Sequence, residues 1–226
     1  KPEECMVINC ESTRYFLQAI QKYKLKTKVL IISSAMMYCP SDEILTEASA
    51  VCNSSPYAES KIKQEELINE FPEIEIVASR SFNHTGPGQL DTSIVPKLAK
   101  GFAEAEKNRQ ESVSFELGDI DSERDFLDVR DVCNAYRILL EEPTKHSIYN
   151  VCSSQCFSVR NIITILEKQS GKKARIMINQ SFINSNERKL ILGDNKRITA
   201  ETSWKLTIPF EQTVYDTYLY WKKKMY

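Results

Sequence analysis

Glycine is scarce in this chain, which holds six glycines among 226 residues. A turn that binds the pyrophosphate of a dinucleotide needs closely spaced glycines after a strand, because backbone amides must approach the phosphate oxygens. None of the six forms such a spacing. Gly86-Pro87-Gly88 follows a predicted strand, but its proline lacks an amide donor and no third glycine follows. The sequence therefore contains no phosphate-binding turn of this kind.

Histidine and paired cysteines are scarce as well. The chain has only two histidines, His84 and His146, and seven cysteines. Cys152 and Cys156 suggest one half of a zinc site, but no second close pair and too few histidines complete it. We therefore expect no bound metal. An odd number of cysteines, without the density of a disulfide scaffold, favours reduced thiols in a cytoplasmic protein.

Long apolar runs and net charge are also missing. No stretch approaches the roughly 20 apolar residues of a transmembrane helix, and no signal peptide is visible at the start. The formal net charge is −1, so no strong field attracts the protein to nucleic acid or to a membrane. We expect neither partner. The chain starts with Lys1 in the middle of a pattern, so we expect a fragment, a processed product or a truncated gene.

Strand and helix patterns alternate along the whole chain, which predicts an α/β fold with a largely parallel sheet. Helices are expected over residues 13–23, 57–71, 94–106, 128–140 and 159–168 and within 208–221. Strands are expected over residues 29–33, 73–78, 112–117, 147–151 and 174–178. The stretch from Arg80 to Gln89 is predicted to be irregular. Gly171 is expected to end the helix before it.

Tyr57 and Lys61 form the most informative motif. The spacing Tyr-x-x-x-Lys occurs three times, and about one match is expected by chance. The surrounding sequence distinguishes the Tyr57/Lys61 match from the other two. It follows a buried-strand pattern ending in Ser33-Ser34, and Ser54-Ser55-Pro56 supplies a helix start. Ser34 is therefore predicted at the carboxyl end of a strand, where ligands bind in open α/β sheets.

These residue types suit the interconversion of alcohols and ketones. A helix places Tyr57 and Lys61 on one face, about 5–6 Å apart at Cβ. The phenol has a reference pKa near 10, and a fixed ammonium beside it favours the phenolate. A nearby serine hydroxyl could hold the substrate oxygen while the tyrosine moves its proton. We therefore interpret Ser34, Tyr57 and Lys61 as catalytic.

Several stretches together resemble the extended short-chain dehydrogenase/reductase family that acts on nucleotide sugars. They include Ile32-Ser-Ser-Ala-Met-Met-Tyr38, Arg80-Ser-Phe-Asn-His-Thr-Gly-Pro-Gly-Gln89 and Arg124-Asp-Phe-Leu-Asp-Val-Arg-Asp131. The second stretch, with the ending from Ser203-Trp204 to Tyr220-Trp221, most resembles the GDP-4-keto-6-deoxy-mannose reductases and GDP-mannose dehydratases of that family. The resemblance covers nearly the whole chain.

The resemblance implies a partial Rossmann-like, doubly wound sheet whose first βαβ unit is absent. Residues 1–85 would be the rest of the cofactor domain. Residues 86–226 would mainly form a smaller C-terminal α/β region for substrate, with some segments returning to the sheet. NADP or NAD would be the cofactor, contacted by Ser33, Tyr57 and Lys61. The nucleotide sugar, preferably GDP-linked, would contact Asn83, Lys97, Arg124 and Glu187.

Departures from the family pattern narrow the reaction. Dehydratases carry an acid one or two residues after the active-site hydroxyl, where this chain has Ala35 and Met36. Reduction or epimerisation therefore fits better than elimination. Asn184-Ser185 replaces an Arg-Pro pair near Glu187, and Cys39 replaces a usual glycine. The family also implies a homodimer through the helices expected at 13–23 and 57–71.

The sequence thus predicts an NAD(P)-dependent nucleotide-sugar oxidoreductase that reduces a GDP-4-keto-6-deoxy-hexose. Two alternatives stay open. One is a nucleotide-sugar epimerase or dehydratase. The other is a truncated, non-catalytic homologue that binds a nucleotide sugar or a partner, which the missing glycine-rich turn favours.

Overall fold

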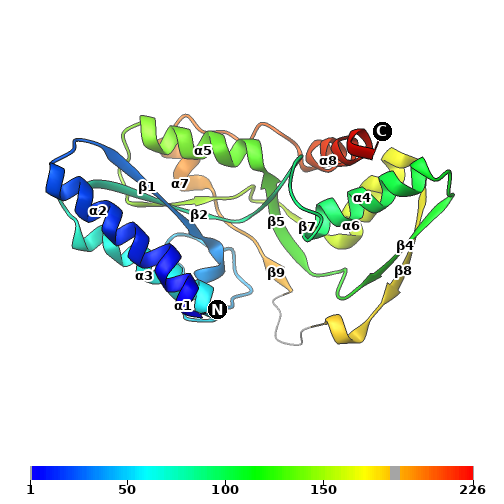
Figure 1. Cartoon of the computed structure of the whole chain (residues 1–226), viewed down its shortest axis with the longest axis horizontal. Helices are drawn as coiled ribbons and strands as arrows, with labels where there is room; N and C mark the ends of the chain where they lie inside the picture. The colour runs from blue at the N-terminus through cyan, green and yellow to red at the C-terminus, as the bar shows by residue number, and fades with distance from the viewer. Residues whose placement is uncertain (1, 184–188, 226) are drawn as a thin grey trace. The chain divides into compact units, whose positions relative to one another are not determined.

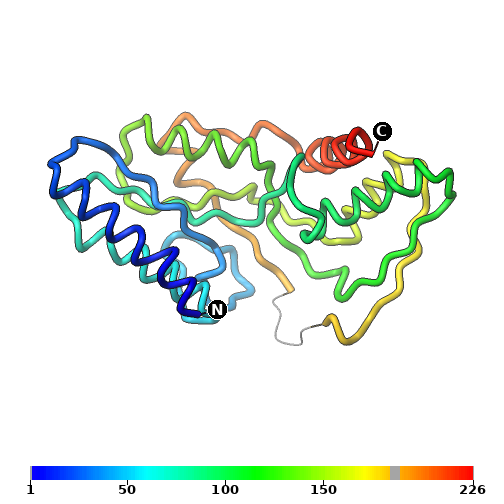
Figure 2. Tube along the Cα trace, in the orientation of Figure 1, coloured from blue at the N-terminus to red at the C-terminus, as the bar shows by residue number. Residues whose placement is uncertain are grey.

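The computed structural model describes residues 2–183 and 189–225, and the chain divides into two compact units. The first unit comprises Lys1–Phe82, Val132–Cys152 and Gly193–Lys205, and the second comprises Asn83–Asp131, Ser153–Leu192 and Leu206–Tyr226. Figure 2 shows the returning segments lying with the blue N-terminal part of the chain in the first unit. The roles predicted for residues 1–85 and 86–226 stay predictions.

A parallel sheet forms the centre of the first unit. Its strand order is β1-β2-β6, with β1 (Lys28–Ser34), β2 (Glu75–Ser81) and β6 (Ile148–Val151). The parallel register pairs Ser34 with Ser81 at the carboxyl ends of β1 and β2. Continuous apolar runs favour such strands because a parallel sheet is buried on its faces. The predicted α/β fold with parallel strands is confirmed.

Helices cover one face of this sheet. The chain begins with α1 (Pro2–Cys5), a π-helix η1 (Met6–Glu11) and α2 (Ser12–Tyr23), and α3 (Pro56–Glu70) runs beside them (Figure 1). Leu17 and Leu67 of these helices pack with Ile31 and Ile76 of the strands. Two short helices, η2 (Ala35–Met37) and α7 (Lys196–Glu201), also lie in this unit, and α5 (Val129–Glu141) lies mostly in it.

The second unit contains two further groups of strands. Strand β5 (Glu123–Asp128) pairs in parallel with β3 (Asn83–Thr85) and β9 (Leu190–Ile191), and antiparallel with β7 (Cys156–Ser158). Strands β4 (Ser112–Leu117) and β8 (Lys173–Ile178) form a parallel pair. A short η3 (Gln180–Phe182) follows.

Three helices build the core of the second unit. They are α4 (Ile94–Lys107), α6 (Val159–Ser170) and α8 (Phe210–Met225), which contact one another (Figure 1). Phe102, Leu166 and Val214 are fully buried among them. Helix α6 ends at Gly171, whose φ of +68° lies in the left-handed region that glycine tolerates, as predicted.

The short elements are where the sequence prediction was wrong. The stretch 80–89 is not irregular throughout, because it contains the end of β2 and the whole of β3. Residues 123–128 form β5, a strand that was not predicted from the sequence. A three-residue strand is too short to show an alternating pattern, and its pairing depends on distant residues. No helix within residues 2–183 and 189–225 is long and apolar enough to cross a membrane.

Candidate active site

The predicted catalytic residues lie in the first unit, at the end of β1 and in the first turns of α3. Ser34 is the last residue of β1, and its Oγ accepts a hydrogen bond of 3.2 Å from the amide of Met36. Tyr57 is the second residue of α3, and Ser55 caps this helix by accepting a hydrogen bond from the Ala58 amide through its side chain. Lys61 Nζ lies 5.8 Å from the centroid of the Tyr57 ring. The structure thus brings Tyr57 and Lys61 together.

The two side chains differ in exposure. Tyr57 is 41% exposed, whereas Lys61 is only 7% exposed. Lys61 Nζ donates to the Ile32 carbonyl at 2.8 Å and to Gln64 Oε1 at 3.1 Å. Burial lowers the pKa of Lys61, and the nearby Glu65 carboxylate opposes this effect. The arrangement places a hydrogen-bonded ammonium beside a phenol that a substrate can reach, which is the geometry of a tyrosine acid.

Ser33 points away from this site. It is buried, and its hydroxyl donates to Met37 Sδ at 3.4 Å. Side chains alternate between the faces of a strand, so Ser33 and Ser34 project from opposite faces of β1. The predicted contact between Ser33 and the cofactor stays a prediction, and the observed side chain faces the protein core.

A buried ion pair connects α3 to the sheet. It was not predicted from the sequence. Arg80 of β2 donates through Nε and Nη2 to the carboxylate of Glu65 on α3, at 3.1 and 2.7 Å. The guanidinium also lies 4.9 Å from the centroid of the Tyr38 ring. Tyr38 donates to Asn150 Oδ1 at 2.6 Å, and burial raises the pKa of Tyr38 to about 12. This network fixes α3 relative to β2 and β6.

The residues predicted to bind the nucleotide sugar lie in the second unit. Asn83 is exposed at the start of β3 and pairs in register with Phe126 of β5. Arg124, two residues earlier on β5, shares the face of Asn83 because alternate side chains project alike. Its Nη1 donates to the Glu123 carbonyl at 3.0 Å and to that of Lys189 at 3.4 Å. Asn83 and Arg124 thus lie on adjacent strands.

Of the other two predicted contacts, Lys97 lies in the described part of the chain and Glu187 does not. Lys97 is exposed on α4, a separate element of the second unit. Glu187 and the neighbouring Asn184-Ser185 lie outside the described residues, so their predicted roles stay predictions. In the part of the chain that the structure describes, no group of three or more His, Cys, Asp or Glu side chains could hold a metal ion.

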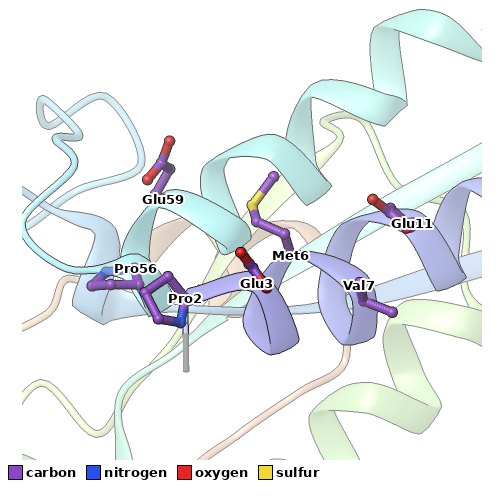
Figure 3. Close-up of a pocket in the computed structure, with 7 residues that line it drawn as sticks. All are labelled: Pro2, Glu3, Met6, Val7, Glu11, Pro56 and Glu59. Atoms are coloured by element: carbon purple, nitrogen blue, oxygen red, sulfur yellow. The ribbon is translucent and has the colours of Figure 1, made fainter.

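A cavity of about 400 Å³ lies next to the start of α3 in the first unit. Figure 3 shows its lining side chains, which come from α1, η1 and the first turn of α3. Met6, Val7 and Pro56 provide apolar walls, and Glu3 and Glu59 are among its acidic residues. Tyr57 and Lys61 are not among its lining residues, so the cavity is distinct from the predicted catalytic pair.

Comparison with known proteins gives consistent matches over almost the whole chain. The family model described as GDP-mannose 4,6 dehydratase matches residues 1–217. A GDP-6-deoxy-D-mannose reductase of Pseudomonas aeruginosa is 30% identical over 99% of this chain and 75% of its own length. A GDP-6-deoxy-D-talose 4-dehydrogenase of Aggregatibacter actinomycetemcomitans is 27% identical over 85% of this chain and 64% of its own length.

Solved structures agree. RMD from Pseudomonas aeruginosa, complexed with NADPH, superposes with a TM-score of 0.90 at 30% identity, covering 99% of this chain and 75% of that protein. A putative epimerase from Burkholderia cenocepacia superposes with a TM-score of 0.89 at 30% identity, covering 98% of this chain and 72% of that protein. These matches confirm the resemblance inferred from the motifs and the Rossmann-like fold.

Proposed function

The chain belongs to the GDP-mannose 4,6-dehydratase family, and from this membership we propose that it is an NAD(P)-dependent oxidoreductase that reduces a GDP-linked 4-keto-6-deoxy-hexose. The observation that carries the proposal is the exposed Tyr57 beside the buried ammonium of Lys61, with Ser34 at the end of the adjacent strand. Ala35 and Met36 follow Ser34, so no acid stands where an elimination would need one. This supports reduction over dehydration.

The residues of the first unit would divide the reaction among them. When bound, a reduced nicotinamide supplies the hydride to the ketone carbon. Ser34 would donate a hydrogen bond to the ketone oxygen, because the Met36 amide already occupies one of its lone pairs and directs its O–H elsewhere. Tyr57 would protonate the developing oxyanion. Lys61 would stabilise the resulting phenolate through its positive charge.

The same residues fit the nicotinamide end of the cofactor. Ile32 and Met36 are each 50% exposed beside Ser34, and they offer apolar surface to an aromatic ring. Tyr57 and Lys61 would contact the adjoining ribose, with Ser33 as the further predicted contact. The sequence supplies no glycine-rich turn for the pyrophosphate. The chain therefore contributes the catalytic half of a cofactor site.

The proposal is tested by the oxidation of NADPH or NADH in the presence of GDP-4-keto-6-deoxy-mannose. The assay uses this chain and any longer product of its gene. We expect cofactor oxidation only with the keto sugar, and its loss in Tyr57→Phe. Tyr220→Phe is the matched control, since Tyr220 and Lys224 share the Tyr-x-x-x-Lys spacing on α8. Full turnover by Tyr57→Phe would contradict the proposal.

A non-catalytic homologue is the second candidate, favoured by the missing glycine-rich turn. Calorimetry distinguishes it, because a chain that binds neither NADPH nor NADH cannot be a working reductase. An epimerase would retain NAD tightly and consume none.

We propose that the protein forms a homodimer through η1, α2 and α3. An exposed apolar surface on η1 and α2 supports this, since Ile8, Tyr15, Phe16 and Tyr23 are each more than half exposed. Such a surface on a helix pair is typical of an interaction site. Sedimentation of the purified chain should give a dimer, and Phe16→Asp should give a monomer. A native chain that stays monomeric would exclude this interface.

We also propose a cytoplasmic location. All seven cysteines are free thiols in the structure, which suits a reducing compartment. Fractionation of cells that express the protein tests this, and recovery from an oxidising compartment would contradict it.

A further inference from the structure

The buried ammonium of Lys61 has a neighbour that the sequence motif does not include. Gln64 stands one turn along α3, is 8% exposed, and accepts from Lys61 Nζ at 3.1 Å through Oε1. A lysine ammonium has only donors, so the carboxamide oxygen of Gln64 must face Lys61 and its NH₂ group must face elsewhere. The orientation of this amide is therefore determined by its partner.

The NH₂ group of Gln64 has a partner on the neighbouring helix. Nε2 donates to Thr13 Oγ1 at 2.8 Å, and Thr13 Oγ1 donates to the Asn9 carbonyl at 2.7 Å. Each group in this series donates to the next, so the hydrogen bonds run in one direction from Lys61 to Asn9. Asn9 lies in the π-helix η1, a type of irregular turn that is frequent at functional sites.

A second path connects Asn9 to the other catalytic residue. Asn9 Nδ2 donates to Ser60 Oγ at 3.0 Å, and Ser60 Oγ donates to the Tyr57 carbonyl at 2.8 Å. Both catalytic residues of α3 are thus linked to one residue of η1. Helix α3 is held against η1 and α2 at the turn that carries Tyr57 and Lys61.

We propose that Gln64 is a positioning residue for Lys61, which holds the ammonium between its own carboxamide oxygen and the Ile32 carbonyl. The inference rests on the proposed function, because it assigns Gln64 to the Tyr57–Lys61 pair. A lysine side chain has many rotamers, and a hydrogen bond restricts them only if the acceptor is itself fixed. Thr13 fixes Gln64, and the strand β1 fixes Ile32. The third N–H of Lys61 then remains for the cofactor ribose, and the charge of the ammonium acts on Tyr57, whose ring centroid is 5.8 Å away.

The test measures Lys61 itself, so it does not depend on turnover. The pH dependence of Lys61 acylation by acetic anhydride is followed by mass spectrometry in the native chain, Gln64→Met and Gln64→Glu. Methionine keeps the length of the side chain and removes the acceptor, whereas glutamate restores an acceptor. Glu65 and Tyr57 are the other titratable groups near Lys61 and are unchanged in all variants.

We expect the midpoint of Lys61 labelling to fall by about one pH unit in Gln64→Met, a tenfold change in the dissociation constant, because the ammonium loses an acceptor. In Gln64→Glu the midpoint should rise to the native value or above it. Gln21→Met is the matched control, because the side chain of Gln21 on α2 donates to the exposed Glu73, and its loss should leave the midpoint unchanged. An unchanged midpoint in Gln64→Met would overturn the inference, even if Tyr57→Phe abolishes activity.

Kinetics provide a second readout in the active protein. Gln64→Met should lower kcat about tenfold while the KM for the nucleotide sugar stays within twofold, because Gln64 acts through Lys61 rather than on the substrate. Gln64→Glu should restore most of kcat. If instead both variants lose stability and KM changes with kcat, Gln64 has a structural role and the inference is wrong.

Discussion

The two units differ in what their buried polar side chains bind. In the first unit, α3, which carries Tyr57 and Lys61, is held by buried side chains that bind one another, such as Arg80 with Glu65. In the second unit, one buried carboxylate binds the backbone of a loop. Asp125 accepts from the amides of Ser153 and Ser154, while Asn83 and Lys97, predicted to meet the substrate, are exposed on its surface.

This difference suits two tasks. Proton transfer requires groups that are fixed before the substrate arrives, because misplacement by about 1 Å can cost a hundredfold in rate. Contacts with a flexible diphosphate can be completed by the ligand. We therefore expect substitutions of the buried side chains between α3 and the sheet to lower the free energy of unfolding strongly. Substitutions at the surface of the second unit should affect ligand binding alone.

The largest expected effect comes from Arg80→Met. The variant leaves the buried carboxylate of Glu65 without its charged partner, which should lower the free energy of unfolding by about 3–5 kcal/mol. The chain has two tryptophans, Trp204 in the first unit and Trp221 in the second. Urea unfolding followed by Trp204 fluorescence in a Trp221→Phe background therefore reports the first unit alone.

Lys63→Met is the control for this measurement. Lys63 forms an exposed pair with Glu66 on the same helix, and exposed pairs contribute little to stability. If Arg80→Met costs no more than Lys63→Met, the support of α3 does not depend on the buried ion pair, and the contrast between the units fails.

Contacts between residues close in the sequence could be predicted from it. Tyr57 and Lys61 are four residues apart on one helix, so their proximity follows from helical geometry alone. The start of α3 was likewise readable from Ser55-Pro56. Local patterns of this kind located the strand, the helix and the proximity of the predicted catalytic pair.

Contacts between distant residues were not predictable in this way. Gln64 meets Thr13 from 51 positions away, and Arg80 meets Glu65 across 15. No periodic pattern in the sequence indicates either of these contacts. The return of residues 132–152 and 193–205 to the first unit also depends on tertiary packing, which a single sequence does not encode locally. The direction of the Ser33 side chain was not predictable either, because it depends on which face of β1 is buried.

An intermediate effect is expected for Arg124→Ala in the second unit. If Arg124 binds the diphosphate, its loss should weaken GDP binding about tenfold or more, since a hydrogen bond between charged groups contributes roughly 1.5–3 kcal/mol. The stability of the second unit should change little. Calorimetric titration with GDP measures the affinity, and Arg175→Ala, an exposed arginine on β8, is the control. Equal affinities in the two variants would remove Arg124 from the binding site.

The smallest expected effect is a pH dependence in the second unit. Burial acts to raise the pKa of Asp128, but hydrogen bonds from Arg130 and Thr213 outweigh it and leave the pKa below its usual value. A depressed carboxylate pKa stabilises the folded state above the pKa of the unfolded chain, near 3.9, and this stabilisation is lost as the pH falls through the folded value.

Asp128→Asn should therefore make the second unit less stable at neutral pH and reduce the further loss of stability below about pH 4. Acid titration followed by Trp221 fluorescence in a Trp204→Phe background measures this unit separately. Asp121→Asn is the control, because Asp121 pairs with Arg160 at the exposed surface and contributes little to folding. If the acid transition of Asp128→Asn matches that of the unsubstituted background, the buried carboxylate does not determine the acid stability of this unit.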